Sequence, residues 1–212
     1  MNKVLRFIFF QVIVRFVVII GLGLNVRRRE LLPKDGPAII VANHNSHLDT
    51  MVLMTMFDPK LLNKVQPVAA MDYFMKNPLL AWFATNIIGI IPLNRKPGKN
   101  QNPLEPVNKA LDEGKILILF PEGSRGEPEH MQHFKKGIAR LAQSHPKVPV
   151  IPVYLHGLGM ALPKGEALFV PYFCDAFIGK PKFFDSTRKE YVDELEHQMH
   201  TLENEHQEIH AC

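Results

Sequence analysis

Residues 38–49 read Ala38-Ile39-Ile40-Val41-Ala42-Asn43-His44-Asn45-Ser46-His47-Leu48-Asp49, an apolar run that gives way to polar side chains. The run is short and rich in β-branched residues, which predicts a buried strand. Ser46 followed by Asp49 three positions later, just ahead of apolar residues 51–54, is typical of the start of a helix. The stretch therefore predicts a strand, a turn that holds His44, and a helix with Asp49 in its first turn.

This arrangement suits proton transfer. Because His44 lies outside the predicted helix, the carboxylate of Asp49 can reach its imidazole. A neutral imidazole takes up a proton near neutral pH, and a neighbouring carboxylate fixes its tautomer and stabilises the imidazolium. Taken alone, the segment leaves two interpretations open. His44 is either a general base with an acidic partner, or a structural loop residue beside a helix-capping Asp49.

Apolar runs and helix-like segments alternate along the rest of the chain. Further strands are predicted at 68–70, 87–95, 116–120, 148–155, 168–170 and 176–178, and helices over 50–66, 72–76, from Pro78, over 104–113, over 136–144 and from Thr187. This alternation predicts an α/β fold with a largely parallel central sheet flanked by helices. Pro149 and Pro152 predict that the strand at 148–155 is irregular or lies at an edge.

Composition indicates one globular domain, residues 31–212, preceded by an N-terminal segment, residues 1–30. The chain has 212 residues, of which 46% are hydrophobic and 22% charged. Residues 1–30 hold six basic and one acidic side chain, and the remainder holds 19 basic and 20 acidic ones. The basic excess is thus confined to the N-terminus, which argues against a nucleic-acid-binding surface. Two cysteines, Cys174 and Cys212, form no disulfide framework and suit a reducing compartment.

The N-terminal segment is strongly apolar from Val4 to Leu24. It is too long for a signal peptide and has no small-residue cleavage site before Arg27–Arg29. A spanning helix would place Arg15 near the middle of the bilayer, at a cost of about 3 kcal/mol. A buried core helix would need partners for its arginines. We therefore expect a helix that lies in the cytoplasmic leaflet, peripheral or monotopic, with Arg27–Arg29 at anionic headgroups.

Polar side chains follow three of the predicted strands. His44 and Asp49 follow the first, Arg95 follows residues 87–94, and the segment Glu122-Gly123-Ser124-Arg125 follows residues 116–120. Ligands of parallel α/β sheets bind beyond the carboxyl ends of the strands. The sequence therefore predicts that these side chains form one site.

The residue types at this site favour a phosphate-bearing substrate. Arginine pairs bidentately with phosphate oxygens, and Lys136, with Lys135 beside it, would add positive charge at the start of the helix 136–144. The sequence has no Gly-x-Ser-x-Gly elbow, which argues against a covalent acyl-enzyme, and no phosphate-cradling Gly-x4-Gly-Lys-Ser/Thr loop. A histidine base beside a phosphate anchor points to activation of a hydroxyl group on a phospholipid-like acceptor.

Four ordered segments now carry a specific resemblance. His44-x4-Asp49, Gly89 to Arg95, Phe120-Pro121-Glu122-Gly123-Ser124-Arg125 and Val148 to Val153 resemble the four sequence blocks of the glycerolipid acyltransferase family, whose bacterial members include 1-acylglycerol-3-phosphate acyltransferases. The resemblance implies that His44 is the general base and Asp49 its partner. It also implies that Arg95, Glu122, Gly123 and Arg125 bind the phosphate and glycerol of the acceptor, and that Pro152 shapes the site.

The resemblance further implies an acyl-CoA or acyl-carrier-protein thioester as donor, no metal or other cofactor, and action at the cytoplasmic face of the inner membrane. The third block departs from the common Glu-Gly-Thr-Arg-Ser pattern. Ser124 keeps a hydroxyl group, Gly126 stands where serine is usual, and Glu127 and Glu129 make the loop acidic.

Two other functions are compatible with these residues. His44, His47 and Asp49, together with His130 and His133, could hold a metal in a phosphoesterase, although their spacing fits no standard zinc signature. A lipid-binding module without catalysis would leave His44 dispensable. The C-terminal histidines, which are His197, His200, His206 and His210, are expected to be exposed on a frayed polar tail and to bind nothing.

Overall fold

The computed structural model describes residues 2–74, 77–95, 98, 102–163 and 168–210. Its centre is a seven-stranded sheet in the order β1-β7-β6-β2-β5-β3-β4. The strands are β1 (Asn25–Arg27), β2 (Ala38–Ala42), β3 (Val65–Ala70), β4 (Ile91–Leu93), β5 (Ile116–Leu119), β6 (Val150–His156) and β7 (Asp175–Ile178). All neighbouring strands run parallel except β6 and β7. The predicted α/β fold with a largely parallel sheet is therefore confirmed.

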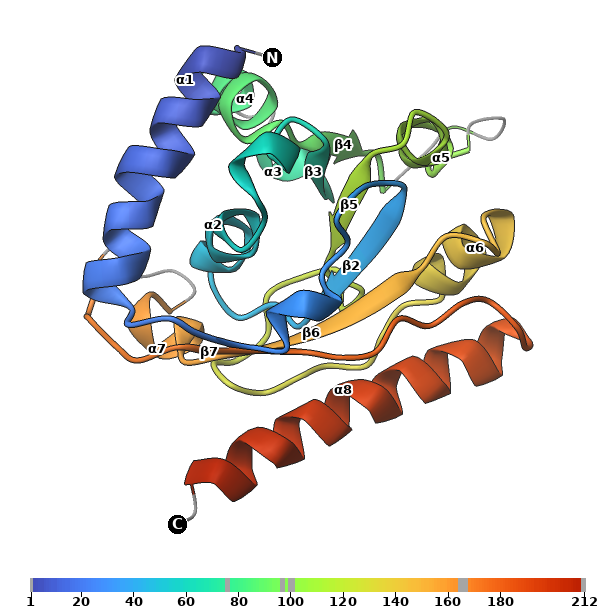
Figure 1. The fold of residues 1–212 in the computed structure, drawn as a ribbon. Helices are drawn as coiled ribbons and strands as arrows, with labels where there is room; N and C mark the ends of the chain where they lie inside the picture. Colours follow the sequence, from blue (N-terminus) through green and yellow to red (C-terminus); the bar gives the residue numbers. More distant parts are fainter. Residues whose placement is uncertain (1, 75–76, 96–97, 99–101, 164–167, 211–212) are drawn as a thin grey trace.

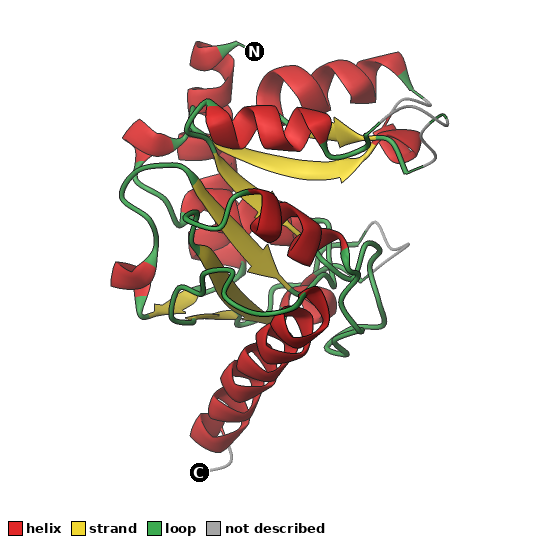
Figure 2. Cartoon of the chain, turned by 90° about the vertical axis from the view of Figure 1, so that its right-hand side faces the viewer, coloured by secondary structure: helices red, strands yellow, loops and turns green. Residues whose placement is uncertain are grey.

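Helices cover both faces of this sheet (Figure 1). The α-helices are α1 (Lys3–Ile8), α2 (Leu48–Thr55), α3 (Met71–Phe74), α4 (Pro78–Phe83), α5 (Glu105–Asp112), α6 (Gly137–Ser144), α7 (Leu158–Ala161) and α8 (Arg188–His210). Side chains alternate along β2, so that Ile40 packs in one apolar cluster and Ile39 in the other. The first cluster includes the N-terminal helix and α2, and the second includes α5, α6 and α8. Figure 2 shows α8 extending beyond the sheet.

The N-terminal segment forms one helix, Lys3–Gly21, which is long and apolar enough to cross a membrane by length and composition. It begins as α1 and continues with wider turns over Phe9–Val14 and Val17–Gly21. One face packs on the domain through the buried side chains of Phe10, Val14, Val18 and Leu22. Arg6 is fully buried, and its guanidinium donates to the backbone carbonyls of Leu62, Val65, Ile87 and Ile88. These carbonyls are the buried partners that an arginine in a packed helix requires.

The cluster Arg27–Arg29, which the sequence predicts at lipid headgroups, also makes contacts within the protein. The guanidinium of Arg27 lies 5.5 Å from the ring centroid of Phe177. Arg28 binds both carboxylate oxygens of Glu205, at 2.7 and 2.8 Å, and Arg29 donates to the carbonyl of Met56. These contacts arise because β1 enters the sheet at residues 25–27, which brings the three side chains close to β7, α8 and the end of α2.

Two apolar segments differ from their predicted structure. Residues 87–95 were expected to form a strand, but the helix that starts at Pro78 runs on through Ala84–Ile88, and the strand β4 covers only residues 91–93. Gly89 ends that helix in a left-handed conformation, with φ 76°. The predicted helix over 50–66 stops at Thr55, a short turn covers Pro59–Leu61, and β3 begins at Val65. Short apolar runs fit either structure, so packing decides between them.

The strand at 148–155 is interior, lying between β2 and β7, and not at an edge. The carbonyl of Pro152 accepts a hydrogen bond from the amide of Gly179, the residue directly after β7. An N–H on residue 152 would face the same way, toward a position beyond the end of β7. Proline is therefore tolerated here because no hydrogen bond of the β6–β7 ladder is lost. Residues 168–170 form no strand, although Val170 donates to the carbonyl of Ala161. Met75 and Lys76 in the predicted helix 72–76, and Cys212, lie outside the described residues.

The C-terminal region is ordered helix rather than the expected frayed tail. The helix α8 opens with the predicted capping box, in which Thr187 and Glu190 exchange hydrogen bonds. Its buried side chains include Val192, Leu195 and Met199. His206 is buried, and its ring lies 3.9 Å from that of His156. Burial of this face by the sheet keeps the last turns helical.

Candidate active site

His44 lies in the turn between β2 and α2, at the carboxyl edge of the sheet. Its Nδ1 is 2.9 Å from Oδ2 of Asp49, in the first turn of α2 as the sequence predicts. The backbone amides of Asn45 and Ser46 donate to the same oxygen, at 2.7 and 2.9 Å. An ionised carboxylate only accepts hydrogen bonds, so Nδ1 of His44 carries the donated proton. This tautomer leaves Nε2 as the basic nitrogen, and no residue in the described part of the chain is hydrogen-bonded to it.

Asp49 is completely buried. Burial raises the pKa of its carboxyl group, and the hydrogen bonds from His44, Ser46 and Asn45 act in the opposite direction. The Ser46 hydroxyl accepts from the amide of Leu48, the first residue of α2. Asp49 therefore fixes the turn before α2 and also orients His44, so a structural role and a role toward His44 are compatible.

Two residues that support His44 were not recognised in the sequence. The ring of Phe120 stacks on the His44 imidazole, with centroids 4.0 Å apart. The amide of Asn43 bridges to β6, because it donates to the carbonyl of Leu155 and accepts from the amide of the same residue. Their positions next to predicted site residues were the only available signal. Both contacts fix the turn that carries His44.

Glu122 ties the loop after β5 to the His44 turn. Its Oε1 accepts from the backbone amide of His44 at 2.8 Å, and its Oε2 accepts from the amide of Gln132 at 3.3 Å. The amide of Gly126 also donates to the carbonyl of His44. Burial of Glu122 raises the pKa of its carboxyl group to about 7. Glu122 thus holds the two loops together, a structural role beside its expected contact with substrate.

Arg95 reaches the same loop from the end of β4. Its guanidinium donates to the carbonyl of Gly123, the residue next to Glu122. Gly123 has a φ of 76°, and a Cβ there would lie 2.5 Å from Nζ of Lys135. The side chain of Lys135 therefore lies over Gly123, and both Lys135 and Lys136, which precedes α6, are exposed. The three predicted strand ends do meet at one edge, where Arg95 and Lys135 place positive charge.

Arg125 lies beside Tyr73, a residue with no recognisable signal in the sequence. Its guanidinium is 5.7 Å from the centroid of the Tyr73 ring, and the Tyr73 hydroxyl is 3.2 Å from Nε2 of His47. Partial burial lowers the pKa of His47, and repulsion from Arg125, and from His44 when His44 is protonated, lowers it further. Tyr73 thus connects the end of β3 to the site.

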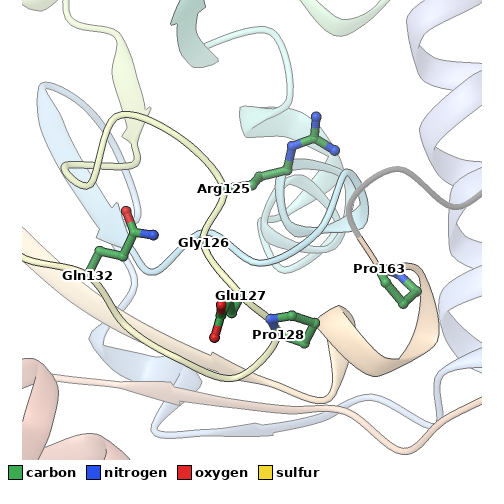
Figure 3. Close-up of a pocket in the computed structure, with 6 residues that line it drawn as sticks. All are labelled: Arg125, Gly126, Glu127, Pro128, Gln132 and Pro163. Carbon is green, nitrogen blue, oxygen red and sulfur yellow. The ribbon is translucent and has the colours of Figure 1, made fainter.

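The acidic residues of the loop lie apart from Arg125. Figure 3 shows Arg125 and Glu127 extending in opposite directions beside an open depression, which is lined by Arg125, Gly126, Glu127, Pro128, Gln132 and Pro163. The Glu129 carboxylate accepts from the amides of Gly157 and Gly159. A Cβ on Gly126 would lie 2.9 Å from the end of the Gln132 side chain and 3.1 Å from the carbonyl oxygen of His130, so space at this position is tight. Ser124 is exposed.

The predicted metal ligands do not converge. Among the described residues, no group of three or more His, Cys, Asp or Glu side chains is placed to hold a metal ion. His47 contacts Tyr73, His133 is exposed 3.4 Å from Glu196, and His130 is exposed. His44 and Asp49 contact each other instead of facing a common cavity with these histidines.

Comparison with known proteins finds a matching family and named relatives. The family model described as Acyltransferase matches residues 23–156, which include all four resembling blocks. The chloroplastic 1-acyl-sn-glycerol-3-phosphate acyltransferase of Arabidopsis thaliana is 31% identical over 145 residues, which make up 68% of this chain and 38% of that protein. The Saccharomyces cerevisiae protein of the same name is 35% identical over 142 residues, 64% of this chain and 44% of the yeast protein.

The fold also matches a solved structure. The crystal structure of the 1-acyl-sn-glycerophosphate acyltransferase PlsC from Thermotoga maritima aligns with a TM-score of 0.75 and 24% identity, covering 94% of this chain and 77% of that one. At this identity the likeness shows the shared fold. Since the family model covers more than half of the residues, the chain belongs to the acyltransferase family.

Proposed function

We propose that the protein transfers an acyl chain from acyl-CoA or acyl-carrier protein to the free hydroxyl group of a lysophospholipid. The preferred acceptor is 1-acylglycerol-3-phosphate, and the product is then phosphatidic acid. The names of the relatives support this acceptor. The observation that carries the proposal is the hydrogen bond of 2.9 Å between His44 and Asp49, at the edge where Arg95 binds the adjacent loop.

The proposed reaction is a direct transfer. Nε2 of His44 takes the proton of the acceptor hydroxyl group while its oxygen attacks the thioester carbonyl. Asp49 stabilises the imidazolium that forms. The carbon–sulfur bond breaks as the ester forms, and the imidazolium returns the proton to the leaving thiolate. The acyl chain thus moves from sulfur to oxygen with no covalent enzyme intermediate.

Positive side chains would hold the phosphate of the acceptor. Arg95 and Arg125 flank the loop, and the amide groups around Gly123 and Ser124 lie within it. Lys135 lies directly over Gly123 and is better placed than Lys136 to reach the same phosphate. A guanidinium fork pairs with two phosphate oxygens at once, so Arg95 would mainly set affinity for the acceptor.

The membrane is the proposed location of this reaction. The exposed apolar face of the helix Lys3–Gly21 would lie in the cytoplasmic leaflet, where both a lysolipid and a soluble thioester can reach the site. The proposed partners are this membrane surface, the lipid acceptor and the thioester donor, with no nucleic acid.

The experiment is a panel of lysolipids incubated with radiolabelled acyl-CoA and detergent-purified protein. Lysophosphatidate should be the best acceptor, and His44→Ala should lower kcat by about 10² to 10⁴-fold, the usual contribution of a positioned base. The matched control is His133→Ala, which changes an exposed histidine outside the site. Near-normal turnover by His44→Ala would refute the assignment and would favour a lipid-binding module.

Chelation separates this proposal from the metal-dependent phosphoesterase. The acyl transfer described above needs no metal, so prolonged treatment with EDTA should leave the rate unchanged. Loss of activity that zinc or magnesium restores would favour the phosphoesterase, as would release of inorganic phosphate from lysophosphatidate.

A further inference from the structure

The outer face of the N-terminal helix is predominantly apolar, with Lys3 and Arg15 as its exposed charged side chains. The apolar side chains that project from it are Val4, Leu5, Phe7, Ile8, Val12, Ile13, Phe16, Ile19 and Ile20, all exposed. Figure 1 shows this helix running along one side of the molecule. Exposed apolar surface of this extent marks an interaction site.

Helix α4 extends this apolar surface at the N-terminal end of the helix. The amide of Asn2 donates to the carbonyl of Asn86 at 3.1 Å, and the rings of Phe9 and Phe83 pack edge to face at 5.1 Å. The outer side of α4 exposes Leu79 (79%), Leu80 and Trp82 (51%). Residues 77–94 contain no charged side chain.

Residues 168–173 extend the surface at the opposite end of the helix. The amide of Tyr172 donates to the carbonyl of Gly21 at 3.2 Å, and the ring of Phe169 lies against Gly21. Phe173 is 82% exposed, and the other exposed apolar side chains here are Leu168, Val170 and Tyr172. This segment also carries no charge.

A lipid bilayer is the partner that this composition fits. The three segments expose aliphatic and aromatic side chains and contain no Asp or Glu, while Lys3 and Arg15 are available to anionic lipid. Tryptophan, tyrosine and phenylalanine are favoured at the boundary between headgroups and acyl chains. The surface is also continuous with a helix that has the length and composition of a membrane span.

We propose that α4 and residues 168–173 join the helix Lys3–Gly21 in a single membrane-docking face, so that this helix lies along the bilayer rather than across it. The helix is fixed to the domain at both ends, by Arg6 at one end and by the bond from Tyr172 to Gly21 at the other. A spanning orientation would therefore draw the domain into the hydrocarbon layer, where its polar groups would lose their water. If the helix docks parallel to the membrane surface, α4 and residues 168–173 lie at the same depth in the bilayer.

This orientation would bring the site edge to the lipid surface. The amide of Val170 donates a hydrogen bond to the carbonyl of Ala161 in α7, which connects the segment 168–173 to α7. The next residue, Leu162, accepts a hydrogen bond from the hydroxyl of Ser46, in the turn that holds His44. Tyr73 precedes α4 by a few residues and contacts Arg125. The delivery of lysolipid to His44 rests on the proposed function, whereas the docking itself does not, and a binding measurement tests docking separately.

Trp82 is the only tryptophan in the chain and therefore reports on α4 alone. The detergent-purified protein is diluted into phosphatidylethanolamine–phosphatidylglycerol vesicles that contain lipid brominated near the top of the acyl chain. We expect strong quenching of Trp82 fluorescence. Vesicle-bound protein whose Trp82 is not quenched would overturn the proposal, and so would failure to bind vesicles. Protection of Trp82 from aqueous acrylamide without quenching by brominated lipid would assign the surface to a second copy of the chain.

A second reporter distinguishes the parallel from the spanning orientation. The variant Trp82→Phe/Phe173→Trp moves the single tryptophan to the other end of the helix. With brominated lipid in the outer leaflet only, the two reporters should be quenched to the same extent, within about twofold. Quenching of one reporter and not the other would show a spanning helix and would refute the parallel orientation.

Substitution tests the contribution of α4 to binding. Leu79→Asn/Trp82→Asn should weaken vesicle binding in a flotation assay by about tenfold, since it removes two exposed apolar side chains from the lipid contact. The matched control is Phe183→Asn, an exposed aromatic residue between β7 and α8, whose neighbour Phe184 packs on the apolar cluster opposite to that of the N-terminal helix. Unfolding curves should be unchanged for both variants. Equal binding by the two variants would contradict the proposal.

Discussion

Two histidine–carboxylate pairs lie at the ends of neighbouring parallel strands, and they differ in how the carboxylate is held. His44 follows β2 and pairs with Asp49, and His156 ends β6 and pairs with Glu129, with 2.9 Å between nitrogen and oxygen in each pair. Only the contact between His44 and Asp49 has the geometry of a hydrogen bond. Nδ1 of His156 is close enough to the Glu129 carboxylate, but the angle between the two groups does not allow a hydrogen bond. Only Asp49 is therefore oriented to hold the imidazole of its partner in one tautomer.

The surroundings of the two pairs account for this difference. Asp49 is anchored by a helix start and by two backbone amides on the same oxygen. Glu129 divides its two oxygens between the amides of Gly157 and Gly159, and His156 stacks on His206 of α8 instead. The first pair is built to orient a proton acceptor, and the second joins a loop, two strands and α8 in one packed cluster.

The largest effect should come from breaking the first pair. Asp49→Asn should lower kcat by about 10²-fold or more, because an amide no longer stabilises the imidazolium. Glu129→Gln is the matched change in the second pair and should leave kcat within about threefold. Steady-state rates with lysophosphatidate measure both. Equal losses in the two variants would show that the pairs do not differ in function.

The second pair should matter for stability instead. His206→Ala removes a buried ring that packs on His156 and Phe177, and it should lower the free energy of unfolding by about 2 kcal/mol. Denaturant unfolding followed by circular dichroism measures this loss, and kcat should remain near normal. His200→Ala, on an exposed position of α8, is the control and should change stability by less than about 0.5 kcal/mol.

A smaller effect is expected on acceptor binding when Arg95, beside the first pair, is replaced. Arg95→Ala should raise the KM for lysophosphatidate by about tenfold and leave kcat nearly unchanged, if its phosphate contact is equally strong in the ground and transition states. Lys135→Ala should raise KM more than Lys136→Ala, since Lys135 covers Gly123. A fall in kcat with unchanged KM for Arg95→Ala would show instead that Arg95 interacts with the substrate mainly in the transition state.

A separate effect should be a pH dependence of stability from Glu122. Because burial raises its pKa from 4.5 to about 7, the folded protein keeps a proton that the unfolded chain releases. Glu122 therefore makes the free energy of unfolding fall between about pH 4.5 and pH 7, with no further change above that range. Glu122→Gln should remove this part of the slope, whereas Glu127→Gln, an exposed carboxylate on the same loop, should not. Parallel slopes in wild type and Glu122→Gln would contradict this account.

The sequence predicted the local units of this fold and most of the site. The β-branched run at 38–42, the capping pattern Ser46 to Asp49 and the box at Thr187 to Glu190 act over a few residues, so their structures follow from local chemistry. The arrival of His44, Arg95 and Glu122 at one edge also followed from the sequence, because parallel strands share their carboxyl ends.

Other features depend on contacts between distant residues, and only the tertiary structure decided them. Residues 87–88 became helix because the helix from Pro78 continues to Gly89, and Arg28 turned to Glu205 because α8 crosses near β1. The contact of Tyr73, in α3, with Arg125 and the exact position of Lys135 over Gly123 also depend on tertiary packing. Short apolar runs and lone charged residues have several local solutions of similar energy, and burial against partners far along the chain selects one of them.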